Sequence, residues 1–231
     1  EYIDGIPLSD ALKRYKIIPF QEAILAIMHI ADALEYAWKE AGIVHKDIKP
    51  ENIMVTTKGS TKLVDLGLAL KPSDVLKSEP SDFRGSPMYM SPEHFLNNKV
   101  DMRSDIYSLG ATFYTLVTGQ VPFPSQSYEE VAKAHIKQPV IPPHKINHSV
   151  PLAVSLIITK MMKKNPDDRF QTPIDLLKEL RNFRMEKQRQ GVEIPMKVTL
   201  DPNGLVTATS NLEPPRQLFV LWQRLGYLQN Q

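Results

Sequence analysis

Residues 45–52 read HKDIKPEN, and residues 65–67 read DLG. Within these two stretches Asp47, Asn52 and Asp65 supply one candidate base and two oxygen ligands at fixed separations. Phosphoryl transfer from a magnesium-nucleotide needs such a set, because positioning and charge neutralisation provide most of the rate enhancement. The two stretches therefore predict both a chemistry and the local fold that brings these side chains together.

Each of these residue types suits one task. A carboxylate such as Asp47 can orient an attacking hydroxyl and accept its proton. Magnesium takes oxygen ligands and keeps some waters, so the amide of Asn52 and the carboxylate of Asp65 suffice as protein ligands. Lys49 would place a positive charge near a phosphate that gains negative charge during transfer. We predict these four residues as the centre of the site.

The chain between the two stretches predicts how Asn52 and Asp65 meet. Residues 53–56 and 62–64 have the composition of short strands, and residues 57–60 have that of a turn. In a hairpin Asn52 precedes the first strand and Asp65 follows the second, so both lie at the same end. The spacing thus has a geometric reason.

Composition excludes several other classes of protein. The 231 residues include 28 basic and 26 acidic ones, for a net charge of +2, which argues against a nucleic-acid binder. There is no cysteine, and the six histidines show no metal-ligand spacing. The charge-free residues 106–128 contain many polar side chains, so we predict a buried helix ending near Gly119 and no membrane span. No signal peptide is visible, and we expect a cytoplasmic protein.

Periodicity and capping signals predict a largely helical chain. Expected helices cover residues 8–15, 21–40 with Gly42 as the stop, 127–137, 151–163, and 172–188 with Thr172 as the cap. The fold class is therefore mainly α (α+β), a helical bundle around the small hairpin.

These motifs resemble the eukaryotic-type serine/threonine protein kinases, in their bacterial-like form. Residues 45–47 match the family's His-Arg-Asp, and residues 65–67 match Asp-Phe-Gly. Residues 85–93 look like the end of an activation segment, with Ser-Pro-Glu for Ala-Pro-Glu, and Arg169 resembles the arginine that pairs with that glutamate, Glu93. The resemblance runs from Glu1 to about Arg184, the kinase C-lobe from the hinge onward.

The resemblance implies a role for each matching residue. Asp47 would be the catalytic base, Lys49 the cation beside the phosphate, and Ser86 the bridge between them. Asn52 and Asp65 would hold Mg²⁺. Asp105 would hold the backbone of the catalytic loop.

The same resemblance implies how ATP would bind and what would be phosphorylated. The backbone of Glu1 and Ile3 would pair with the adenine edge as the hinge, and Met54 would pack under the ring. The phosphate acceptor would be a Ser or Thr hydroxyl of a protein substrate. Since the hinge falls at Glu1 and the ten glycines form no G-x-G-x-x-G loop, we expect these residues to lack the N-lobe and to be inactive alone.

Two substitutions depart from the family pattern. Leu66 replaces Phe and keeps an apolar side chain. Lys46 replaces an Arg that usually receives a phosphorylated activation loop through a bidentate fork, and a lysine offers only a point charge. Regulation through Ser73, Ser78 or Ser81 of the activation segment is therefore left open.

The last part of the chain has no counterpart in the kinase pattern. We divide the chain into residues 1–188, the kinase C-lobe, and residues 189–231, an appendage. Strand-like residues 196–200 and 205–209 flank a turn, which predicts a second hairpin. Apolar residues follow at helical spacing: Leu218, Leu221, Trp222, Leu225 and Leu228. This helix would either pack on its own chain or form a docking or dimerisation surface.

Two further interpretations of the chain stay open. One is a non-catalytic kinase-like interaction module, a pseudokinase or scaffold, although a scaffold needs none of Asp47, Lys49, Asn52 and Asp65. The other is a small-molecule kinase of the aminoglycoside or choline type. Such enzymes share the catalytic-loop Asp and Asn but lack the Ser-Pro-Glu segment and the Glu93–Arg169 pair.

Overall fold

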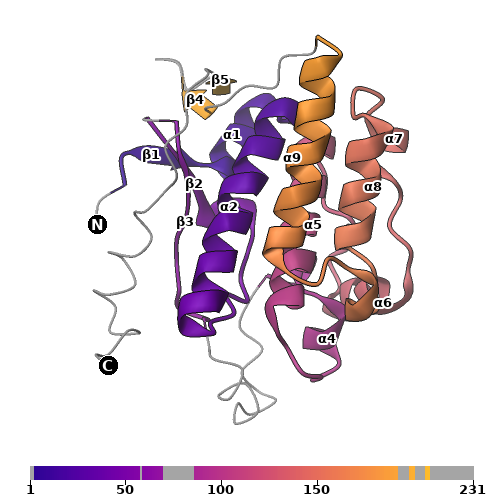
Figure 1. Ribbon diagram of the computed structural model, residues 1–231. Helices are drawn as coiled ribbons and strands as arrows, with labels where there is room; N and C mark the ends of the chain where they lie inside the picture. The colour runs from indigo at the N-terminus through magenta and orange to yellow at the C-terminus, as the bar shows by residue number, and fades with distance from the viewer. Residues whose placement is uncertain (1–2, 58, 70–85, 192–197, 201–205, 209–231) are drawn as a thin grey trace.

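A central helix, α5 (Met102–Thr118), organises the fold (Figure 1). The computed structural model describes residues 3–57, 59–69, 86–191, 198–200 and 206–208. Every residue of α5 from Ser104 to Thr118 is buried, and Asp101 caps its first turn by accepting from the amide of Arg103. The threonine hydroxyls inside it donate to backbone carbonyls, so its polar side chains are satisfied in the core.

This helix confirms the prediction of a buried core helix that ends at Gly119, where the chain turns into the left-handed region. None of the helices in the described part of the chain combines the length and the apolar character that crossing a membrane requires. A helix that is apolar on every face is one that packs against protein all round, as α5 does from Ser104 to Thr118.

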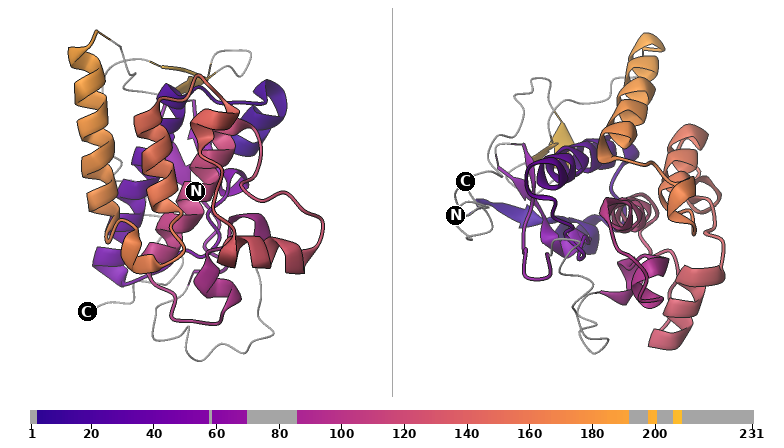
Figure 2. Two further views of the ribbon diagram at one scale, coloured as in Figure 1. Left: turned by 90° about the vertical axis from the view of Figure 1, so that its right-hand side faces the viewer. Right: turned by 60° about the horizontal axis from the view of Figure 1, so that its bottom comes forward.

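Long helices pack on both sides of α5. Helix α2 (Phe20–Ala41) contacts α5 and α9 (Pro173–Arg189), and α8 (Leu152–Met161) contacts α5 from the other side (Figure 2). Gly42 ends α2 with a positive φ of 59°, as its position in the sequence predicts. The shorter helices are α1 (Leu8–Tyr15), α4 (Pro92–Phe95), α6 (Tyr128–Lys137) and α7 (Pro143–Ile146), with 3₁₀ turns η1 (Pro50–Asn52), η2 (Pro87–Tyr89) and η3 (Pro166–Asp168).

Thr172 begins α9 as its N-cap. Its hydroxyl accepts from the amide of Asp175 at 3.2 Å and donates to the Asp175 carboxylate at 2.7 Å. We expect Thr172→Ala to lower the free energy of unfolding by about 1 kcal/mol, because the amide of Asp175 loses its acceptor. Thr172→Ser, which keeps the hydroxyl, should stay close to the wild type. Urea titration followed by circular dichroism measures both, and equal stability of the two variants would contradict the role of the cap.

A small antiparallel sheet lies beside α2 (Figure 1). The predicted hairpin forms from β2 (Ile53–Thr56) and β3 (Thr61–Leu63), with Ile53 opposite Leu63. A third strand, β1 (Gly5–Pro7), pairs with β2 and was not predicted from the sequence. Gly5 permits this pairing, because a Cβ there would collide with the backbone carbonyl of Val55. The strand is too short for its composition to reveal it.

The predicted second hairpin forms from β4 (Val198–Leu200) and β5 (Val206–Ala208), which pair antiparallel. β4 lies near β2 and α2. The expected helix containing Trp222 and the activation-segment serines Ser73, Ser78 and Ser81 lie outside the described residues. The division into residues 1–188 and 189–231 stays a prediction. The mainly α bundle around a small hairpin, the kinase C-lobe arrangement, is confirmed.

Candidate active site

The start of α5 holds the loop between α2 and β2 in place. The carboxylate of Asp105 accepts hydrogen bonds from the backbone amides of His45 at 2.8 Å and Lys46 at 2.9 Å. His45 is itself buried, and burial lowers its pKa to about 4, so its ring is neutral near physiological pH. Its Nδ1 accepts from the amide of Asp47 at 3.4 Å. The predicted contact of Asp105 with the loop backbone is therefore present.

Four of the predicted residues meet in one polar cluster. Lys49 Nζ lies 2.8 Å from Asp47 Oδ2 and donates to Ser86 Oγ at 2.8 Å. Asn52 Nδ2 donates to the backbone carbonyl of Asp47 at 2.8 Å and to Asp47 Oδ2 at 2.9 Å. The amide of Ser86 donates to Asp47 Oδ1 at 3.3 Å. Ser86 thus contacts both Asp47 and Lys49, although it is far from them in the sequence.

The hairpin places Asp65 at the same end as Asn52. The amide of Val64 donates to the Asn52 carbonyl at 2.9 Å, which extends the β2–β3 pairing to the residue just before Asp65. Asp65 has a positive φ of 64°, and its Oδ1 accepts from the amide of Gly67 at 3.0 Å. The carboxylate is exposed, while the neighbouring Leu66 is buried. The turn therefore leaves the Asp65 carboxylate exposed to solvent and buries the side chain of Leu66.

The donor set fits a magnesium ion. Asn52 uses its Nδ2 for both hydrogen bonds to Asp47, so its Oδ1 is not engaged by any residue that the structure describes. Across the described residues, no group of three or more His, Asp or Glu side chains could hold a metal ion. Magnesium does not require one, since it keeps several waters and is shared with substrate phosphates. Asn52 Oδ1 and the exposed Asp65 carboxylate are suitable ligands.

Two of the three predicted nucleotide-contacting residues, Met54 and Ile3, lie in or just before the small sheet. Met54 is half-buried in β2, where it stands opposite Pro7 of β1 and Lys62 of β3. Ile3 is half-buried just before β1. Glu1 lies outside the described residues. Among the described residues, no hydrogen bond or ion pair joins Ile3 or Met54 to Asp47, so the roles of all three rest on the resemblance alone.

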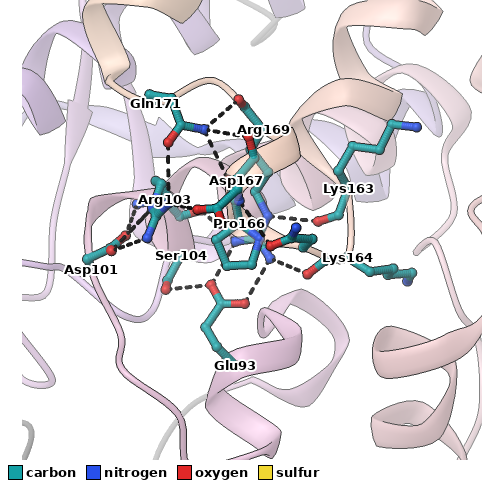
Figure 3. Close-up of polar contacts among 11 residues, drawn as sticks. Glu93, Asp101, Arg103, Ser104, Lys163, Lys164, Pro166, Asp167, Arg169 and Gln171 are labelled. Atoms are coloured by element: carbon teal, nitrogen blue, oxygen red, sulfur yellow. Dashed lines mark hydrogen bonds and ion pairs between the residues drawn. The ribbon is translucent and has the colours of Figure 1, made fainter.

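Arg169 forms a fully satisfied buried ion pair with Glu93 (Figure 3). Its NH1 and NH2 donate to Glu93 Oε1 and Oε2 at 2.7 and 2.8 Å. The remaining N–H groups donate to the backbone carbonyls of Lys163, Arg103 and Lys164. All five guanidinium donors are therefore used, and one side chain ties α4 to α5 and to the segment after α8.

Several members of this network were not predicted. Ser104 donates to Glu93 Oε1 at 2.6 Å. Arg103 pairs with Asp101 at 2.8 Å and with Asp167 at 2.6 Å (Figure 3). The spacing of Asp101 and Arg103 on a helix start was a signal for the first pair. Nothing in the sequence signalled the contact with Asp167, because it depends on how two distant segments pack.

Taken together, the helical bundle, the anchored loop and the hairpin that presents Asn52 and Asp65 define the larger lobe of a protein kinase. The family model described as the protein kinase domain matches residues 1–180. The chain therefore belongs to the protein kinase family.

Curated relatives of the chain include bacterial serine/threonine kinases. A probable serine/threonine-protein kinase of Clostridium perfringens is 38% identical over 186 residues, which cover 80% of this chain and 27% of the relative. A probable serine/threonine-protein kinase of Clostridium acetobutylicum is 36% identical over 184 residues, covering 80% and 28%. The serine/threonine-protein kinase PknB of Mycobacterium leprae is 33% identical over 181 residues, covering 78% and 29%. The matched part of this chain thus spans under a third of the length of these relatives.

Proposed function

We propose that the protein carrying this chain is a serine/threonine protein kinase, which transfers the γ-phosphoryl group of ATP to Ser or Thr hydroxyls of protein substrates with Mg²⁺. The observation that carries the proposal is the contact of Lys49 Nζ with both Asp47 Oδ2 and Ser86 Oγ, each at 2.8 Å. Asp47 thus offers a base and Lys49 a positive charge at the same place, and Ser86 holds both from a separate segment of the chain. The family membership of the chain supports this assignment.

The two oxygens of Asp47 have different tasks in this proposal. Oδ2 is held by Lys49 and Asn52, whereas Oδ1 accepts only the longer hydrogen bond from the Ser86 amide among the described residues. Oδ1 is therefore the oxygen that orients the acceptor hydroxyl and receives its proton. Fixing the carboxylate in advance avoids reorganisation when the reaction occurs.

The remaining residues bind and neutralise charge. Bound Mg²⁺ would supply a positive charge on the phosphate oxygens, and Asn52 and Asp65 would hold it. Lys49 would stabilise the negative charge that develops between nucleotide and acceptor. Met54 and the backbone of Glu1 and Ile3 would contact the adenine.

The proposal is tested with the intact protein, Mg-ATP labelled in its γ-phosphate, and myelin basic protein as acceptor. We expect label on serine and threonine after acid hydrolysis. Label transferred only to aminoglycosides or choline would replace the proposal with a small-molecule kinase. Absence of any transfer, with a protein partner still bound, would favour the non-catalytic interaction module.

Ser86 offers a test of the polar cluster. Ser86→Ala removes the hydroxyl that accepts from Lys49, and we expect about a tenfold loss in kcat/KM, the size of one hydrogen bond to a charged group. Ser86→Thr keeps the hydroxyl and should retain most activity. Steady-state kinetics of the intact protein measures both variants, and equal losses would show that side-chain volume rather than the hydroxyl matters here.

A further inference from the structure

His135 connects three elements around the candidate site. It lies on α6, is fully buried, and its two ring nitrogens reach different partners. Nδ1 lies 2.9 Å from the hydroxyl of Tyr107 on α5, and Nε2 lies 3.2 Å from the backbone carbonyl of Met88 in η2. The ring also stacks against Phe95, with 5.7 Å between the ring centroids, and packs T-shaped against Phe123, with 4.9 Å between the centroids. A histidine with both nitrogens hydrogen-bonded and its ring packed against two aromatic rings has a single orientation.

The chemistry of the partners fixes the tautomer. A backbone carbonyl only accepts, so Nε2 must carry the proton that it donates to Met88. The ammonium of Lys164 lies close by, donating to the carbonyls of Ala134 and His135 at 3.2 and 2.7 Å. Burial first, and then this charge, lower the pKa of His135 to about 3. The ring is therefore neutral, and its Nδ1 accepts from the Tyr107 hydroxyl.

The bond to Met88 reaches the candidate site through a short, closed turn. Ser86 precedes η2, and the amide of Tyr89 donates to its carbonyl at 3.0 Å, which closes the turn around Met88. The Ser86 hydroxyl and amide contact Lys49 and Asp47. A hydroxyl that reaches Asp47 would meet a carboxylate that the Ser86 amide, directly before η2, already contacts. The position of this turn depends on what holds Met88.

We propose that His135 is a positioning residue for the acceptor peptide. Its imidazole, protonated on Nε2, holds η2 against α5 and α6. It thereby fixes the surface beside Asp47 that a Ser- or Thr-containing peptide contacts. That the surface receives a peptide rests on the proposed kinase function. The tautomer of His135 and its bond to Met88 do not depend on that function. His135 itself is assigned no contact with the reacting atoms. Its loss should affect binding of the acceptor more than the chemical step.

The first experiment does not need activity. Long-range ¹H–¹⁵N correlation spectra of the imidazoles in this chain at neutral pH should show His135 neutral, with its proton on Nε2. In His135→Leu the amide signals of Ser86, Met88 and Tyr89 should shift, and in His135→Gln, whose amide can still donate to Met88, they should shift much less. A proton on Nδ1, an imidazolium, or unchanged signals in His135→Leu would overturn the inference.

The second experiment measures the consequence in the intact protein with myelin basic protein as acceptor. We expect His135→Leu to raise the KM for the acceptor about tenfold, with the KM for ATP unchanged and kcat nearly so. His135→Gln should restore most of the affinity. His148→Gln, at an exposed histidine, is the matched control and should resemble the wild type. Equal changes in both KM values, or none, would overturn the positioning role.

Tyr107→Phe guards against a folding artefact, because it keeps the core volume and removes only the hydroxyl. We expect this variant to remove the hydrogen bond to Nδ1 of His135, so that its ring is held less firmly. The KM for the acceptor should rise by a smaller factor than in His135→Leu. Thermal unfolding of each variant shows whether it is folded. If the wild type transfers no phosphate, the proposed function fails, while the spectra still decide whether His135 holds η2.

Discussion

Asp47→Asn in the intact protein is expected to lower the turnover of phosphoryl transfer about 10³-fold, the range reached by a positioned general base. Asparagine has nearly the same shape as aspartate but only one acceptor oxygen. With that oxygen turned toward Asn52, at 2.9 Å in the wild type, the variant loses only the longer hydrogen bond of 3.3 Å from the Ser86 amide. It cannot accept a proton from an acceptor hydroxyl at neutral pH. The KM for ATP should change little, because Asp47 is not proposed to hold the nucleotide or the metal.

Initial rates at saturating Mg-ATP and acceptor measure this change. Asp168→Asn, which removes a charge at an exposed position away from the cluster, is the matched control and should keep the wild-type rate. A turnover of Asp47→Asn equal to the wild type would show that another group removes the proton. A parallel loss in both variants would point instead to the net charge of the lobe.

Arg169→Ala is expected to have the largest effect on stability, lowering the free energy of unfolding by about 4 kcal/mol. The substitution leaves the buried carboxylate of Glu93 without its cation and removes the donors to three backbone carbonyls. Arg169→Lys should recover only part of the loss, because an ammonium has three donors and no planar fork. The loss should also loosen the contact of α4 with α5, since Glu93 then keeps its hydrogen bond from Ser104 but not those from Arg169.

Urea unfolding followed by tryptophan fluorescence or circular dichroism measures the loss. Lys178→Ala breaks an exposed pair with Asp175 at 3.3 Å and is the matched control, for which we expect no measurable change in the midpoint. A similar midpoint for Arg169→Ala and Lys178→Ala would mean that the buried pair contributes no more than a surface pair.

The same pair predicts a pH dependence. Burial raises the pKa of Glu93, but the hydrogen bonds and charge of Arg169 outweigh burial and bring the pKa from its ordinary 4.5 down to about 2. A carboxyl whose pKa is lower in the folded state stabilises the fold above about pH 4.5, and this stability is lost as the pH falls toward 2. Unfolding free energies measured across this window should fall more steeply for the wild type than for Glu93→Gln. Equal slopes would contradict a depressed pKa of Glu93.

Local signals in the sequence predicted most elements correctly, because each depends on few residues. The α1 helix and the β2 strand have the predicted bounds, and Gly42 and Gly119 stop α2 and α5 where the sequence places them. The third strand, β1, was missed because its pairing depends on Gly5 approaching a strand that is distant in the sequence. Proximity of Asn52 and Asp65 was predictable because a short hairpin alone sets it.

By itself, the sequence determined the family, the helical class and the chemical identity of Asp47, Lys49, Asn52 and Asp65, because these follow from motifs and short-range spacing. The family resemblance already implied the contact of Ser86 with Lys49 and the Glu93–Arg169 pair. Only the tertiary structure decided the backbone partners of Arg169 and the place of His135 between Tyr107 and Met88. Apart from the bonds of Arg169 to the nearby Lys163 and Lys164, these contacts join segments that are separated in the chain by dozens of residues. Their geometry comes from how helices pack around α5, where burial makes each unpaired polar group costly, and no local pattern in the sequence encodes it.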